Sequence, residues 1–150
     1  MQKISKLVVT IVTVGVATAV LAGVAGAGST LSKKDYLKQG NAICKDGNAQ
    51  LEVVFRQAFE GLGKNDRPSD AQIEQAVGGA VPIFRTVLGE IEALEGPPAL
   101  DKKVDALVAK YEARLDELEA DPASAFNDED PFKKLDKQSR KLGLKTCAQS

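Results

Sequence analysis

Two cysteines, Cys44 and Cys147, are the residues of this chain whose type and spacing most directly indicate covalent chemistry. They are the only cysteines among 150 residues, and 103 positions separate them. A redox-active pair is more often a C-x-x-C element. An even number of cysteines in an exported chain is instead typical of structural disulfides. We therefore predict one Cys44–Cys147 disulfide, which closes nearly the whole domain.

The chain has no histidine, and this absence removes a large block of enzyme chemistry. Ser-His-Asp and Cys-His systems need an imidazole as general base. Zinc sites use histidines or clustered thiolates, which the two distant cysteines do not supply. Phosphate-binding loops of the G-x-x-x-x-G-K-[ST] or G-x-G-x-x-G type are also missing from the sequence. We expect no catalytic residue, no metal and no cofactor.

The alternative function is an enzyme that uses a pair of carboxylates, namely a hydrolase acting on a cell-wall or extracellular substrate. Such a pair would come from Glu90, Glu92, Glu95, Asp101 and Asp105. Carboxylate catalysis needs one acid in an apolar pocket and another in a polar one, and nothing in this spacing indicates such a cleft.

A second acidic group is the run Asn127-Asp128-Glu129-Asp130. It lacks the spaced ligands, the glycine and the distal glutamate of a calcium-binding EF-hand loop. We interpret it as a solvated loop in which Asp130 caps the last helix.

The last helix is strongly basic, through Lys133, Lys134, Lys137, Arg140 and Lys141. One interpretation is contact with an anionic surface, either lipid head groups or an acidic wall polymer. The other is a solvated face that lies opposite acids of the third helix, Asp116, Glu117 and Glu119. We favour the solvated face.

The first 27 residues have the three parts of a secretory signal peptide. Two lysines precede an uncharged apolar run from Leu7 to Leu21, and Ala25 and Ala27 form an A-x-A cleavage site. We predict cleavage after Ala27 and a location in the cell envelope or outside the cell. The alternative is a retained membrane anchor, because the uncharged stretch from Leu7 to Ala27 has 21 residues, which is enough to span a bilayer.

Residues 28–150 are of a length typical of one domain. They carry 18 basic and 21 acidic side chains, a net charge of −3, which argues against general affinity for nucleic acid. The partner is therefore expected to be an unidentified envelope or extracellular molecule, with membrane contact only if the leader is retained.

Four amphipathic helices are needed to position these residues. The apolar period and the cap residues predict helices over 32–62, 69–94, 98–120 and 130–142. Pro82 lies inside the second helix, where we expect a kink or a split. Short connections between the helices predict an all-α, antiparallel four-helix bundle.

Two further features of the helices concern the space between them. Gly40 and Gly47 flank Cys44 on one face of the first helix, and we expect them to clear space for the C-terminal tail. A groove between the first two helices, near Phe55, Phe59 and Phe84, is the expected apolar pocket, although core packing explains those rings equally well.

Short elements spread over the mature chain resemble those of small exported envelope proteins of actinobacteria. They are Tyr36, Ala42-Ile43-Cys44, Leu94-Glu95-Gly96-Pro97-Pro98 and Gly143-Leu144-Lys145-Thr146-Cys147. Many members of that group carry a lipobox, which this sequence lacks. The resemblance implies a helical, disulfide-linked exported domain of uncharacterised role, and it assigns no catalytic residue. From the sequence we infer a non-catalytic binding or interaction module.

Overall fold

The computed structural model describes residues 30–63, 66–126 and 130–148. The elements in these ranges are α1 (Lys33–Ala58), α2 (Asp70–Glu92), α3 (Pro98–Ala120), the 3₁₀ turn η1 (Pro122–Phe126) and α4 (Lys133–Leu142). No strand occurs in these ranges, and none of their helices is both long and apolar enough to span a membrane. The expected signal peptide, residues 1–27, lies outside the described residues.

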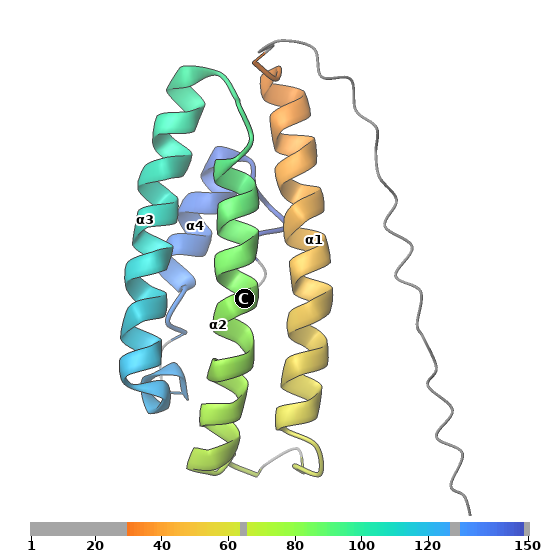
Figure 1. Ribbon diagram of the computed structural model, residues 1–150, viewed down its shortest axis with the longest axis vertical. Helices are drawn as coiled ribbons and strands as arrows, with labels where there is room; N and C mark the ends of the chain where they lie inside the picture. The colour runs from red at the N-terminus through yellow and green to blue at the C-terminus, as the bar shows by residue number, and fades with distance from the viewer. Residues whose placement is uncertain (1–29, 64–65, 127–129, 149–150) are drawn as a thin grey trace, which may run out of the picture.

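The four helices form an antiparallel bundle, which confirms the predicted fold class. Successive helices run in opposite directions, and α4 lies behind the other three (Figure 1). The core is continuous across all four helices and the tail, with Tyr36, Val81, Val104, Leu115 and Leu144 among its most buried members.

Local capping chemistry fixes the helix ends. The Ser32 hydroxyl accepts a hydrogen bond from the Asp35 amide at the start of α1, and Ser69 and Gln72 form a complete capping box at the start of α2. Gly143 ends α4 in the left-handed conformation, with φ of 102°. The first helix is shorter than predicted, because α1 ends at Ala58 and the residues up to Leu62 form a turn.

Of the two alternatives predicted at Pro82, a kink or a split, the split does not occur. Helix α2 continues without a break from Asp70 to Glu92 (Figure 1). A proline removes a single backbone donor, and the carbonyl left without its partner belongs to Gly78, which is exposed to water. The Pro82 carbonyl accepts a hydrogen bond of 2.9 Å from the Thr86 hydroxyl.

Two glycine–valine pairs let α1 and α2 approach each other closely. A Cβ atom added at Gly79 would lie 2.7 Å from Val54 Cγ1, and one added at Gly47 would overlap Val87. The prediction for Gly47 is therefore wrong, because this glycine clears space for α2 and not for the tail. The prediction for Gly40 is confirmed, since a Cβ there would lie 2.7 Å from Leu144 Cδ2 in the tail.

The fourth helix is much shorter than the other three. Helix α4 has 10 residues and spans about 15 Å, whereas α1, α2 and α3 have 23 to 26 residues and span about 35–39 Å. Among the residues that the structure describes, helix consequently fills the fourth position of the bundle over less than half its length. The rest of that position contains the candidate site.

Candidate functional site

An open-sided hollow of about 950 Å³ occupies the part of the bundle that α4 does not fill. It lies beside the second half of α1, the first half of α2 and the end of α3. The 3₁₀ turn η1 and the start of α4 border it. Its volume lies at the upper end of the range of small-molecule sites.

The inner wall of the hollow is apolar and includes small residues. Helices α1, α2 and α3 contribute Leu51, Ala76, Val77, Ala80, Val81, Leu115 and Leu118. Alanine at positions 76 and 80 leaves room that a larger side chain would fill, so the hollow follows from the sequence of α2 as well as from the length of α4.

All five phenylalanines of the chain gather around this hollow. Phe55 stacks on Phe59, and the edge of Phe59 meets Phe126 at a centroid distance of 5.5 Å. In a second group, Phe132 lies 5.3 Å from Phe84 and 5.7 Å from Tyr111 between ring centroids. Two aromatic groups from distant parts of the sequence therefore contribute rings to the lining of one cavity.

The predicted groove near Phe55, Phe59 and Phe84 lies within this larger hollow. Phe55 and Phe84 line it, whereas Phe59 supports Phe55 and Phe126 from behind. Phe55 is 37% exposed and Phe126 is 46% exposed, so neither ring is packed as a core residue. The sequence analysis did not predict that residues of α3, η1 and α4 also line the site. The helical period shows which residues of one helix share a face, but only the packing of the bundle brings different helices together.

A buried polar group borders the hollow where α3 meets α4. The Tyr111 hydroxyl donates a hydrogen bond of 2.8 Å to Asp136 Oδ1 and lies 3.1 Å from the Ser139 hydroxyl. Asp136 is 4% exposed. Burial, and to a smaller extent Asp136, raise the pKa of the Tyr111 hydroxyl well above its ordinary value near 10. This group joins α4 to the bundle and supplies a polar element to an otherwise apolar wall.

The exposed edge of the hollow carries charges of both signs. Lys45, Glu52 and Arg56 line it from α1, and Asp130 lines it from the segment before α4. The sequence predicted that Asp130 caps the start of the last helix. This prediction is wrong, because α4 begins at Lys133. Its carboxylate instead accepts a hydrogen bond of 2.8 Å from the Phe132 amide and closes the turn before the helix. The other residues of the predicted acidic loop, 127–129, lie outside the described residues.

The predicted Cys44–Cys147 disulfide is confirmed, with a Cα–Cα distance of 4.9 Å. Two asparagines that the sequence analysis missed hold the same tail. The Asn41 side chain donates to the Gly143 carbonyl at 3.0 Å and accepts from the Thr146 amide at 2.8 Å. Asn48 donates to the Thr146 carbonyl at 2.9 Å. Asn41, Cys44 and Asn48 are spaced by three and four residues, a helical period that marks them as one face.

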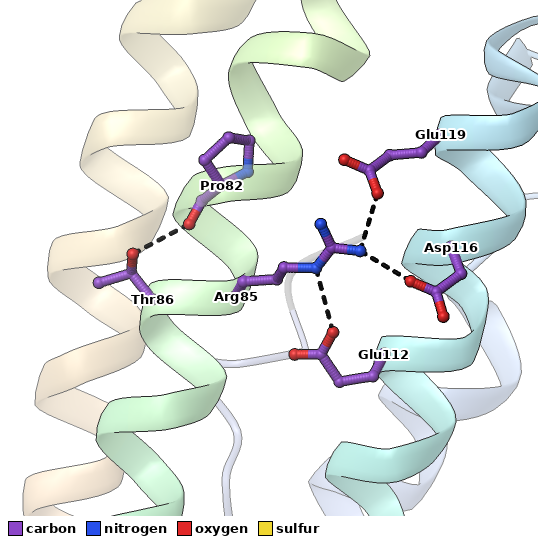
Figure 2. Close-up of polar contacts among 6 residues, drawn as sticks. All are labelled: Pro82, Arg85, Thr86, Glu112, Asp116 and Glu119. Carbon is purple, nitrogen blue, oxygen red and sulfur yellow. Dashed lines mark hydrogen bonds and ion pairs between the residues drawn. The ribbon is translucent and has the colours of Figure 1, made fainter.

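The sequence analysis placed the acids of α3 opposite the basic helix, and this prediction is wrong. Figure 2 shows Asp116, Glu112 and Glu119 around Arg85 of α2, at 2.7, 3.2 and 2.8 Å from its guanidinium. The hydrogen bond with Glu119 is the largest contribution that raises the pKa of Arg85 above its ordinary value. The remaining acid, Glu117, pairs with Arg114. The four acids are therefore engaged by arginines of α2 and α3.

The basic side chains of α4 are all exposed: Lys133, Lys134, Lys137, Arg140 and Lys141. Arg140 donates two hydrogen bonds to the Ala148 carbonyl and so helps to hold the tail. Within the described ranges, the four lysines form no ion pair.

The carboxylates considered for hydrolysis lie at the other end of the bundle from the hollow. Glu90, Glu92, Glu95 and Asp105 are exposed, and none of them lines the hollow. Asp101 accepts hydrogen bonds of 3.1 and 3.2 Å from the Gly96 amide, which fixes the turn before α3. Among residues 30–63, 66–126 and 130–148, no group of histidine, cysteine and acidic side chains is arranged to hold a metal ion.

No protein-family model, no curated protein and no solved structure matches this chain. The resemblance to exported actinobacterial envelope proteins thus stays a prediction, and the functional argument rests on the geometry of the hollow.

Proposed function

We propose that this protein is an exported, non-catalytic binding module of the cell envelope or extracellular space that takes an apolar ligand into the hollow. The observation that supports the proposal is a cavity of about 950 Å³ with an apolar wall and two phenylalanine rings more than a third exposed. A protein selected for stability alone would bury those rings, because each contributes about 1.5–3 kcal/mol when it leaves water.

The shape of the site favours an elongated apolar group. The wall is formed along α2 by residues one turn apart, Val77, Val81 and Phe84, and the rings of Phe55, Phe126 and Phe132 also line the hollow. An acyl chain or a similar unbranched apolar segment fits such a cavity, with its polar end at the charged edge near Lys45 and Arg56.

A fluorescent fatty-acid analogue tests the proposal by equilibrium titration of the exported protein. We expect saturable binding with one site. Phe126→Ser removes an exposed ring of the hollow and should weaken binding by about tenfold, which corresponds to about 1.4 kcal/mol. Val53→Ser is the matched control, because Val53 is 42% exposed on α1 and does not line the hollow.

Filling the cavity provides the complementary variant. Ala80→Phe places a ring in the space that Ala80 leaves free and should abolish binding while the helical circular dichroism spectrum is retained. Saturable binding that is unchanged in both Phe126→Ser and Ala80→Phe would place the ligand elsewhere and refute the proposal.

A hydrolase is the second candidate, and one observation favours it. The hollow has a buried carboxylate, Asp136, and a solvated one, Asp130, which is the contrast of environments that carboxylate catalysis uses. Against this role, Asp136 already accepts the Tyr111 hydroxyl hydrogen bond as part of the α3–α4 contact. Assays of hydrolysis on wall glycans and esters, with Asp130→Asn as the variant, decide: a turnover lost in Asp130→Asn supports the enzyme.

A further inference from the structure

We propose that the basic face of α4 docks this protein on an anionic lipid membrane, so that the hollow exchanges its apolar ligand with the bilayer. The basic face consists of Lys133, Lys134, Lys137 and Lys141. This inference rests on the proposed function, because it names the partner surface of the same site.

The position of two of the four lysines opposes the stability of their own helix. Lys133 and Lys134 occupy the first turn of α4, where the helix dipole favours acidic side chains. The helix also has no side-chain hydrogen bond at its N-cap, Phe132. Cations at the N-terminus of a 10-residue helix weaken it, so their presence is better explained by an external anion than by folding.

The acids of α3 do not neutralise this face. Arg85 engages Glu112, Asp116 and Glu119, and Arg114 engages Glu117 (Figure 2). Residues 127–150 carry six basic and four acidic side chains, a net charge of +2, whereas residues 28–126 carry twelve basic and seventeen acidic ones, a net charge of −5. The mature domain is acidic overall, and its positive charge is concentrated around α4.

Continuity with the hollow decides between a membrane and a soluble polyanion. The residues directly before the basic face, Asp130, Pro131 and Phe132, line the hollow, and Phe126 stands 46% exposed beside them. An acidic polymer would satisfy the lysines and leave the Phe126 ring in water. A lipid surface satisfies both, because basic residues bind the head groups while exposed aromatic rings enter the interface.

Co-sedimentation with vesicles tests the inference. The exported protein is mixed with vesicles of neutral phosphatidylcholine and with vesicles containing phosphatidylglycerol, in about 0.1 M salt. The readout is the difference between the two lipids, since a retained leader would bind both. We expect the triple variant Lys133→Glu, Lys134→Glu, Lys137→Glu to lose roughly a hundredfold in affinity for the anionic vesicles.

The control variant reverses three exposed lysines on other helices: Lys38→Glu, Lys102→Glu and Lys103→Glu. It should retain most of the affinity, because it has the same net charge as the test variant and differs only in location. Replacing the same α4 lysines by glutamine keeps the test informative if charge reversal unfolds α4.

Three results would overturn the inference: equal binding to neutral and anionic vesicles, equal loss in the test and control variants, or binding to soluble polyphosphate without binding to vesicles. None of them affects the fatty-acid titration in solution, which tests the proposed function by itself.

Discussion

Removing the disulfide should destabilise the protein strongly and leave the fold intact. The Cys44–Cys147 bond closes a loop of about 100 residues. In the chain-entropy model, the closure of such a loop contributes about 4.7 kcal/mol to the free energy of unfolding. An unfolding entropy of about 2.1 cal/mol/K per residue gives the 123 residues from 28 to 150 about 0.26 kcal/mol/K. The expected fall in melting temperature is therefore about 18 °C.

The assay is thermal unfolding, followed by circular dichroism. It compares the double variant Cys44→Ala/Cys147→Ala with the wild-type protein in the presence and absence of a reductant. The double variant and the reduced protein should agree, because both remove the same cross-link. The disulfide-free protein should still unfold cooperatively, since Asn41 and Asn48 hold the tail by hydrogen bonds that do not depend on sulfur. A fall of less than about 5 °C would refute the loop-entropy reasoning.

Three further predictions concern other parts of the bundle. Gly47→Leu should lower the yield of disulfide-bonded monomer well below that of Lys45→Leu, because the new side chain overlaps Val87 of α2, whereas Lys45 is exposed; equal yields on non-reducing gels would contradict this packing. Arg85→Met leaves three acids of α3 facing one another, so the urea midpoint should fall and the loss should shrink at about 1 M salt, whereas a loss independent of salt would contradict the electrostatic explanation. Burial, followed by the charges of Asp101 and Asp105, raises the pKa of Tyr36 to about 12, so the stability linked to this hydroxyl is present below pH 10 and is lost as the pH rises through 12. Because the chain has two tyrosines and no tryptophan, the absorbance of the folded protein at 295 nm should stay flat through pH 10, and a titration midpoint at 10 would contradict the burial argument.

Much of the fold could be predicted from local signals. The serine caps, the Gly96-Pro97-Pro98 break and the glycine at position 143 mark the ends of the helices, and the structure keeps them. The disulfide was predictable for a different reason, because two cysteines allow one intramolecular pairing. These features depend on neighbours in sequence or on residue type alone.

The wrong predictions concern contacts that depend on which helices face each other. Gly47 faces Val87 of α2, although its spacing from Cys44 equally suits a contact with the tail. The acids of α3 turn to Arg85, a single cation of α2, instead of the lysine-rich helix nearer in sequence. The periodicity of one helix shows which residues share a face but not which partner covers that face.

The hollow could have been inferred from the unequal helix lengths, since a last helix that ends at Leu142 and begins after Pro131 cannot cover three partners more than twice as long. Its lining could not have been inferred in the same way. Phe55, Phe126 and Phe132 come from three separate elements, and only the packed bundle places them around one space.

The most direct test of the proposed binding site is nuclear magnetic resonance of the protein during titration with an unbranched fatty acid. The methyl groups of Val77, Val81 and Leu115 line the hollow, whereas that of Val53 lies on the outer face of α1. The account predicts saturable shifts of the first three and direct contacts between them and the acyl chain, with Val53 unchanged. An absence of shifts at the hollow, or contacts confined to other surfaces, would contradict it.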